Sequence, residues 1–213
     1  MIILICNIPM RRELSELHPV DGISLNGKPL MANYAINVEM AKILKKNEEI
    51  HVIFMKSHGG DDCTNENIRK FKDELGCIDH EKSLNIRITY EEIDVPFTFA
   101  KDITSTVFRN LIGSIKRITD KHNDVSIYAD VTFNSKMLPM IVFCAFNFAE
   151  KYLGADVKKI IYGKVEFKEG NPVNETAAVF NITMLYCLNS LTNSIDCDSP
   201  ETALKVIDDF INI

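Results

Sequence analysis

The stretch YADVTFNSKMLPMIVFCAF, residues 128–146, places a short polar segment between two apolar runs. This segment offers three small hydrogen-bonding side chains and one cation: Thr132, Asn134, Ser135 and Lys136. Lys136 comes just before an apolar helix that should begin near Leu138, and a helix N-terminus beside a lysine attracts anions. The same residues also suit an ordinary strand-to-helix turn in which Asn134 or Ser135 caps the helix. An anion site and a capped turn therefore both remain open.

A second group of candidate residues follows the first apolar run of the chain. Residues 1–6 are apolar, continuous and largely β-branched, which is typical of a strand buried on both faces. The next apolar run, residues 50–55, is followed by a lysine on the same side of the expected sheet. Together these two strand ends contribute the candidate binding residues Asn7, Ile8, Pro9, Met10, Arg11 and Lys56.

Apolar runs alternate with amphipathic segments along most of the chain. The pattern predicts strands at residues 1–6, 50–55, 85–93, 125–130 and 157–163, and helices at 30–46, 64–75, 101–122 and 138–153. Such alternation indicates an α/β fold, a Rossmann-like parallel sheet with helices on both faces. Residues 164–167 are a candidate antiparallel edge strand. Two further helices, near 182–191 and 200–211, form a short C-terminal helical appendage, so we divide the chain into residues 1–180 and 181–213.

The most plausible strand order is 3-2-1-4-5, numbering the strands along the chain. Ligands of open parallel sheets bind beyond the carboxyl ends of the strands where this order reverses, here between strands one and four. The loop Asn7 to Arg11 and the segment Thr132 to Met137 then face one another. The whole stretch Asn7 to Pro29 reads as a long irregular loop, and we expect it to order over a ligand. His18 within it is expected to be solvated.

Composition excludes several classes of protein. The chain has 213 residues and a formal net charge of -6, which argues against a general DNA binder or a membrane-surface binder. No apolar run is long enough to span a bilayer, and six cysteines without a C-x-x-C pair suggest buried free thiols in a cytoplasmic protein. The glycine fingerprints of NAD and ATP sites are missing, so we expect no cofactor. The segment KSHGGDDC, residues 56–63, offers a conceivable metal cluster, but its two glycines favour a turn before a capped helix, so we expect no metal.

A family resemblance becomes visible in YADVTFNSKMLPMIVFCAFNFAE followed by VKKIIYGKVEF. This region resembles the CRISPR-associated Rossmann-fold (CARF) family, in which a strand ends in an Asp-x-Thr loop. A small residue, a basic residue and a proline-containing apolar helix follow, and the next strand ends in Tyr-Gly. The resemblance is sharp over residues 128–167 and extends over about residues 1–180. Many relatives have His-Gly where this chain has Phe133 and Asn134, which leaves the size of the ligand open.

The resemblance implies a homodimer that binds a cyclic oligoadenylate, the second messenger of type III CRISPR antiviral defence. Each subunit would contact it through Asn7 to Arg11 and Thr132 to Met137, with Phe133, Met10 and Met137 as candidates to stack on adenine. The apolar helix from Leu138 would be covered by the second subunit. Arg117 to His122 fit an R-x4-H ribonuclease signature, but we interpret this as coincidence because they end a helix that leads into a strand.

Two functions remain open, and a small-molecule enzyme on an unrelated Rossmann-like fold is a weaker third. The first is a ring nuclease that cleaves the messenger without a metal, with Lys136 and Ser135 as catalytic residues and a 2',3'-cyclic phosphate as product. The second is a non-catalytic sensor that regulates a separate effector protein. Few residues follow the CARF-like part, too few for an effector domain of its own, and this expectation favours the enzyme.

Overall fold

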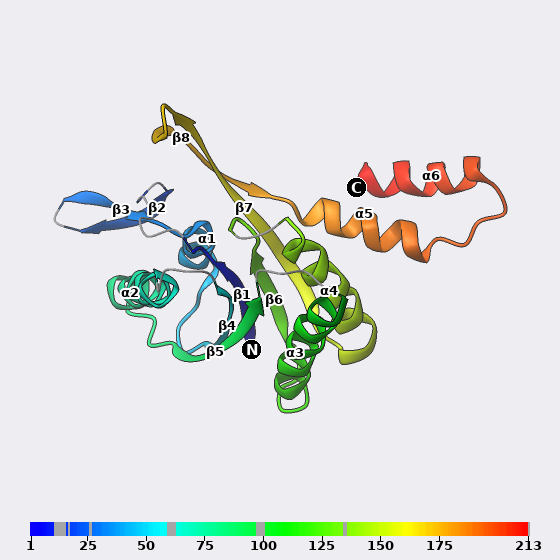
Figure 1. The fold of residues 1–213 in the computed structure, drawn as a ribbon, viewed down its shortest axis with the longest axis horizontal. Coiled ribbons are helices and arrows are strands. Elements are labelled where there is room, and N and C mark those ends of the chain that lie inside the picture. The colour runs from blue at the N-terminus through cyan, green and yellow to red at the C-terminus, as the bar shows by residue number, and fades with distance from the viewer. Residues whose placement is uncertain are drawn as a thin grey trace.

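The fold is built on a six-stranded sheet in the order β5-β4-β1-β6-β7-β8 (Figure 1). The computed structural model describes residues 1–10, 16, 18–25, 27–58, 63–96, 101–133 and 136–212. The strands of this sheet are β1 Ile2–Ile8, β4 Glu49–His58, β5 Arg87–Pro96, β6 Ser126–Asp130, β7 Asp156–Lys168 and β8 Asn171–Asn181. All neighbours pair in parallel except β7 and β8, which are antiparallel. The predicted Rossmann-like fold and strand order are confirmed.

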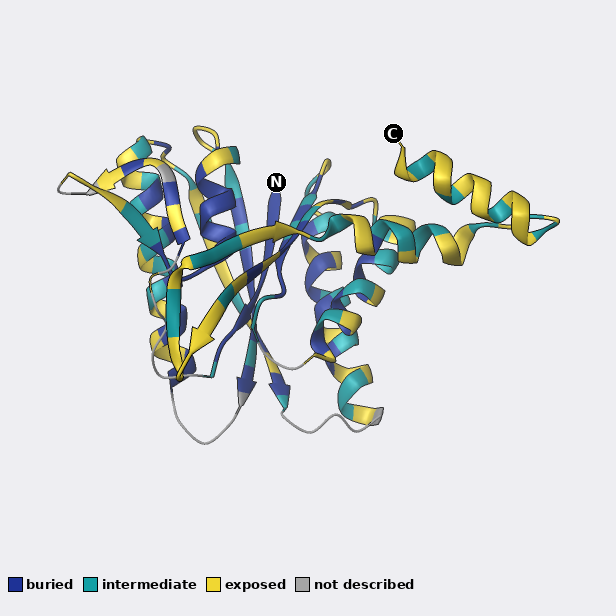
Figure 2. Ribbon diagram, turned by 90° about the horizontal axis from the view of Figure 1, so that it is seen from above, coloured by how far each residue is buried: buried dark blue, intermediate teal, exposed yellow. Residues whose placement is uncertain are grey.

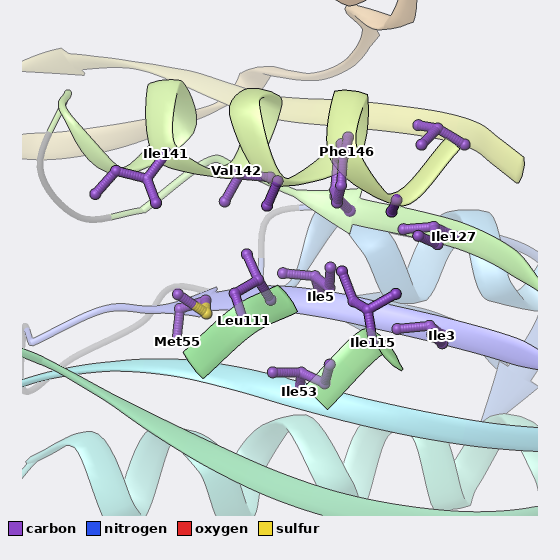
Figure 3. Packing of buried hydrophobic residues seen from close by; sticks show 14 of the residues in the cluster. Ile3, Ile5, Ile53, Met55, Leu111, Ile115, Ile127, Ile141, Val142 and Phe146 are labelled. Atoms are coloured by element: carbon purple, nitrogen blue, oxygen red, sulfur yellow. The ribbon is translucent and has the colours of Figure 1, made fainter. Parts of the chain in front are cut away.

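Two pairs of helices bury the two faces of the sheet. Helices α1 (Ala35–Ile43) and α2 (Cys63–Lys82) cover one face, and α3 (Lys101–Thr119) and α4 (Leu138–Leu153) cover the other. Side chains along β1 alternate accordingly: Ile3 and Ile5 pack toward α3 and α4 (Figure 3), whereas Leu4 and Cys6 pack toward α1 and α2. Every residue of β1 is buried, which explains its uninterrupted apolar sequence.

Helix α4 packs through one stripe and exposes the opposite one. Its buried residues are Leu138, Ile141, Val142, Ala145, Phe146 and Ala149. Met140 is 64% exposed and Tyr152 is 63% exposed, and Cys144, which we expected to be buried, is exposed as well. The helix ends at Gly154, whose φ of 66° lies in the left-handed region that glycine adopts without strain. An apolar surface on α4 is therefore left uncovered within one chain.

The segment expected to be irregular, Asn7 to Pro29, contains regular structure in its described residues. Strand β1 continues to Ile8, and β2 (His18–Leu25) pairs with β3 (Lys28–Ala32) as an antiparallel hairpin. Gly22 and Gly27 have φ values of 77° and 75°, which accommodate the bulge and the turn of this hairpin. The prediction of a helix from residue 30 is also wrong at its start, because residues 30–32 belong to β3 and α1 begins at Ala35.

The C-terminal part extends away from the sheet. Residues 164–167, our candidate edge strand, continue β7, and the antiparallel edge strand is β8. Helix α5 (Thr183–Ser194) is fastened at its start, where the Thr183 hydroxyl accepts a bond from Ile160 N–H at 2.8 Å and buried Tyr186 donates to Glu150 at 2.5 Å. Helix α6 (Pro200–Ile211) has no buried residue and projects with α5 (Figures 1 and 2). The division of the chain at residue 180 stays a prediction.

Candidate functional site

The carboxyl ends of β1 and β6 lie side by side, as the predicted strand order requires. The two strands pair from Ile2 and Ser126 to Cys6 and Asp130. On its other side β1 pairs with β4, which brings Ile8 opposite Lys56. The chain leaves β1 toward the β2–β3 hairpin and leaves β6 toward α4, so the two connections diverge from one point. This is the geometry in which open parallel sheets bind their ligands.

Asp130, the last residue of β6, joins this sheet edge to α1. Its side chain is fully buried. One carboxylate oxygen accepts a hydrogen bond from Ile36 N–H at 3.2 Å, near the start of α1, and the other accepts from Thr132 N–H at 2.8 Å. Burial raises the pKa of Asp130, while these donors favour its charged form. Asp130 therefore caps α1 from across the sheet and fixes the first residues of the loop after β6.

Thr132 and Gly163 continue this polar chain to β7. The Thr132 hydroxyl accepts a hydrogen bond from Gly163 N–H at 2.7 Å. A Cβ atom on Gly163 would lie 3.0 Å from the Ala35 Cβ, 3.2 Å from the His18 Nε2 and 3.2 Å from the Thr132 Oγ1, so the site has no room for a side chain. The Asp-x-Thr and Tyr-Gly sequences thus hold β6, β7 and α1 together at the candidate site.

His18 lies against this junction. Our expectation that it would be solvated is wrong. His18 is only 5% exposed, because β2 places its ring against Gly163, and the absence of a side chain on Gly163 leaves room for the ring. Burial lowers the pKa of His18, so the neutral imidazole is favoured. The β2–β3 hairpin is therefore seated on the candidate site through a buried residue.

The N-terminus of α1 is occupied by the protein itself. Besides Asp130, Glu74 from α2 accepts hydrogen bonds from Asn33 N–H at 2.6 Å, Tyr34 N–H at 3.4 Å and the Asn37 amide at 2.8 Å. Burial raises the pKa of Glu74 to about 7 despite these donors. Two carboxyl groups of the chain thus take the position that an anion would otherwise fill.

The N-terminus of helix α4 differs from that of α1 in the groups that surround it. Within the described residues, its N-cap Met137 makes no side-chain cap hydrogen bond, and no acidic residue lies in its first turn. Lys136 precedes it and is exposed. Compared with α1, and as far as the structure describes the residues before it, α4 thus has main-chain N–H groups and an adjacent cation that can receive an anion. Asn134 and Ser135, the proposed neighbours of Lys136, lie outside the described residues.

The residues that follow β1 are mostly buried. The Asn7 amide nitrogen donates to the Phe133 carbonyl at 3.2 Å, which ties the end of β1 to the loop after β6. The Asn7 side-chain oxygen is buried and has no hydrogen-bond partner among the described residues. Ile8 and Pro9 are buried and Met10 is half-buried. Asn7 therefore holds an unpaired acceptor at the strand end, and such a buried acceptor calls for a ligand or a water.

The remaining predicted contact residues differ in how accessible they are. Phe133 packs edge-to-face against Tyr34 with ring centroids 5.8 Å apart and is half-buried, so its ring is largely engaged. Met137 is 45% exposed. Lys56 donates to Asn65 at 2.7 Å and to Glu92 at 3.2 Å, and its side chain is 14% exposed, so its charge is already partnered. Arg11 lies outside the described residues.

Sequence reasoning named neither Asp130 nor Glu74 as part of the site. Asp130 carries a signal that could have revealed it, because a charged residue ending an apolar strand must find buried donors. Glu74 carries none, since the segment KFKDEL places it among charged residues of an ordinary amphipathic helix.

Membrane-spanning helices and metal-binding clusters can be assessed only over the described residues. There, no helix is long and apolar enough to cross a membrane. In the same ranges, no three His, Cys, Asp or Glu side chains come together as ligands for a metal ion.

Comparison with known proteins yields a distant structural likeness. No protein-family model matches the sequence. No curated protein matches it either. Among solved structures, the chain is similar to "Enterococcus italicus Csm6 bound to cyclic hexa-2'-fluoro-hexa-dAMP", with a TM-score of 0.47 and 11% sequence identity. The match covers 98% of this chain and 50% of that one, so this chain spans about half the length of the Csm6 chain. A likeness at that level carries no argument about function.

Proposed function

We propose that the protein binds a cyclic oligoadenylate where β1 and β6 end, and that it opens the ring. The observation that carries this proposal is the start of α4, which has no acidic residue in its first turn and follows exposed Lys136, at the point where the strand order reverses. The resemblance of residues 128–167 to the CARF family supplies the class of ligand.

The groups at this site suit the parts of such a ligand. Each linkage carries one negative charge, for which the α4 N–H groups and Lys136 are suited. The Asn7 oxygen, which has no hydrogen-bond partner in the described part of the chain, can accept a hydrogen bond from an adenine amino group or a ribose hydroxyl. Met10 and Met137, both partly accessible, can pack against adenine faces. Phe133 is less suited to stacking because its ring already contacts Tyr34.

A homodimer would complete the site. Met137 and Met140 are exposed at the start of α4, beside Lys136, and Tyr152 is exposed near its end. These residues form an apolar surface that a second copy of the chain can cover. Around a two-fold axis each binding group would occur twice, which matches a ring of repeated nucleotides.

Cleavage would use a nucleophile that the ligand itself carries. A ribose 2'-hydroxyl gives up its proton to water and attacks the neighbouring phosphorus. The bond to the 5'-oxygen breaks, that oxygen takes up a proton from water, and a 2',3'-cyclic phosphate remains. The protein orients the ribose for in-line attack and stabilises the negative charge that develops on the phosphate and the leaving oxygen. We assign the second task to Lys136 and phosphate positioning to Ser135. This route needs no metal.

The test is incubation of the protein with cyclic tri-, tetra- and hexa-adenylate, following binding and product together. Lys136→Ala should slow cleavage by about a hundred- to a thousand-fold, because one charge-stabilising donor is lost. Ser135→Ala should slow it less, and EDTA should have no effect. Lys168→Ala, which removes an exposed lysine at the far end of β7, is the matched control and should cleave normally. Normal cleavage by Lys136→Ala, or loss of activity in EDTA, would refute this mechanism.

A second candidate is a sensor that binds the messenger and signals to an effector. The observation in its favour is α6, which has no buried residue and exposes Leu204 and Ile211. A sensor predicts binding without turnover, and Lys136→Ala would then reduce affinity alone. Light scattering with and without messenger tests the dimer, and a monomer at micromolar concentration in both samples would rule out a shared site.

A further inference from the structure

A pocket of about 420 Å³ lies at the opposite end of the sheet from the candidate messenger site. Its walls come from the first residues of β4 and β5 and from the last turn of α3 with the residues after it. Ile50 and Ile118 supply apolar surface. A volume of this size matches sites for small organic molecules. The pocket shares no residue with the messenger site described above.

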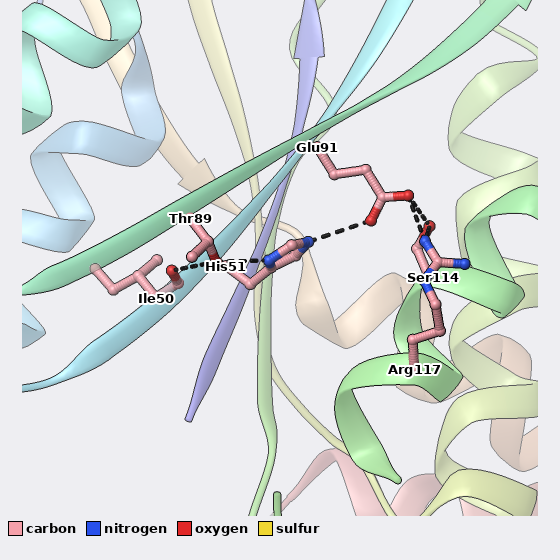
Figure 4. A network of polar contacts seen from close by, with 6 residues as sticks. All are labelled: Ile50, His51, Thr89, Glu91, Ser114 and Arg117. Carbon is pink, nitrogen blue, oxygen red and sulfur yellow. Dashed lines mark hydrogen bonds and ion pairs between the residues drawn. The ribbon is translucent and has the colours of Figure 1, made fainter. Parts of the chain in front are cut away.

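A chain of polar contacts rigidifies one wall of this pocket (Figure 4). His51 lies opposite Thr89 in the β4–β5 pairing, and its Nδ1 is 2.7 Å from the Thr89 hydroxyl. The other imidazole nitrogen is 3.3 Å from Glu91. Glu91 in turn accepts hydrogen bonds from Ser114 at 2.7 Å and Arg117 at 2.5 Å. The Thr89 hydroxyl also lies 3.4 Å from the Ile50 carbonyl, so the polar groups of this wall bond to one another and hold it in a fixed shape.

The charges around the pocket favour an anion. Its two carboxylates are both neutralised, because Glu49 pairs with Arg87 and Glu91 pairs with Arg117. Lys121, an exposed residue of the same lining, has no ion-pair partner among the residues that the structure describes. His122 also lines the pocket, 3.8 Å from Glu49. The lining therefore keeps one surplus positive charge on a protein whose formal net charge is -6.

We propose that this pocket is a second ligand site, for a small organic acid. The anionic head, a carboxylate or a phosphate monoester, binds at Lys121 beside Arg87, and the apolar body lies over Ile50 and Ile118. The Thr89 hydroxyl and both His51 ring nitrogens are already bonded within the wall, so they shape the pocket and the head is held by the positive charge. The inference rests on the pocket alone and is independent of the proposed messenger binding.

The test uses the full chain with ¹⁵N-labelled histidine imidazoles and three probes of similar shape. Benzoate and phenyl phosphate should shift the His51 and His122 signals in a saturable way, and neutral benzyl alcohol should not. Lys121→Gln should weaken benzoate binding by about tenfold, the worth of a hydrogen bond to a charged group. Lys168→Gln, an exposed lysine outside the pocket, should leave the affinity unchanged. The anion that binds with the higher affinity identifies the preferred head group.

Three outcomes would overturn the proposal: no saturable shift with either anion, equal affinity for benzyl alcohol, or unchanged benzoate binding in Lys121→Gln. Phenyl phosphate can also bind at the start of α4, so a Lys136→Gln variant is titrated in parallel. That variant should keep the shifts at His51 and His122, even if messenger binding is lost. Failure of the pocket and failure of the messenger site are thus distinguished.

Discussion

Replacing Gly163 by alanine tests whether the junction of β6, β7 and α1 is as tightly packed as the structure indicates. Gly163 does not have the left-handed backbone that requires glycine, so only space accounts for it. A new Cβ would approach the Ala35 Cβ to 3.0 Å, which is closer than real Cβ atoms normally come. Ala35 has no side-chain torsion that could relieve this contact, because its Cβ is fixed to the backbone of α1. The strand or the helix must therefore move.

Two opposing effects set the size of the loss. Alanine in place of glycine normally stabilises by about 0.4–1 kcal/mol, because the unfolded chain loses freedom. Overpacking of a dense site costs about 1–3 kcal/mol. We expect a net loss of about 1–2 kcal/mol, which in a chain of this length lowers Tm by about 3–6 °C. Messenger affinity should fall as well, since the Thr132 hydroxyl that bonds Gly163 N–H must shift with the loop.

The matched control is Gly76→Ala in the middle of α2, where a new Cβ meets nothing within 4 Å. This variant should gain up to about 1 kcal/mol, because alanine has the higher helix propensity. Urea and thermal unfolding followed by circular dichroism measure both variants. A Gly163→Ala protein as stable as the wild type would show that the junction has free space, and the structural role assigned to Gly163 would be wrong.

Three further predictions address the polar groups and the appendage. Glu74 has a folded pKa of about 7 against 4.5 normally, so its contribution to stability is complete below pH 4.5 and lost as the pH rises to 7; between these limits the free energy of unfolding should fall by up to about 3 kcal/mol. Urea midpoints across that range should show this fall in the wild type and in exposed Asp73→Asn, but much less in Glu74→Gln. Asp130→Asn should cost about 1–3 kcal/mol in the same assay, because one accepting oxygen becomes a donor that faces a main-chain N–H; an unchanged midpoint would contradict the buried cap. Amides of α6 should exchange with solvent much faster than those of α4 in mass spectrometry, since no α6 residue is buried, and equal protection would mean that another surface covers it.

The central sheet could be predicted because its strands carry a local signal. The runs at residues 1–6, 50–55 and 125–130 are mainly apolar on both faces, and only a strand covered from both sides needs that. The β2–β3 hairpin was missed because its strands mix polar and apolar residues and include prolines. Asn26–Gly27, a pair typical of tight hairpin turns, was the available signal.

The candidate site could be predicted only in part. Its location follows from strand order, which alternation of strands and helices largely determines. The accessibility of each side chain to a ligand does not follow from strand order, because it depends on partners far away in the chain. Lys56 is neutralised by Glu92, and the Phe133 ring is engaged by Tyr34. Neither contact leaves a trace in the spacing of residues near these positions.

The attachment of α5 makes the C-terminal helices a mechanical lever. Thr183 and Tyr186 fasten only the first turns of α5, and they fasten it to β7 and α4, the two elements next to the candidate site. The helix has 12 residues and is therefore about 18 Å long. A tilt of about 10° at the fastened end would displace the other end, and α6 with it, by about 3 Å. Movements of α4 too small to alter the core would thus be magnified at the tip of the molecule.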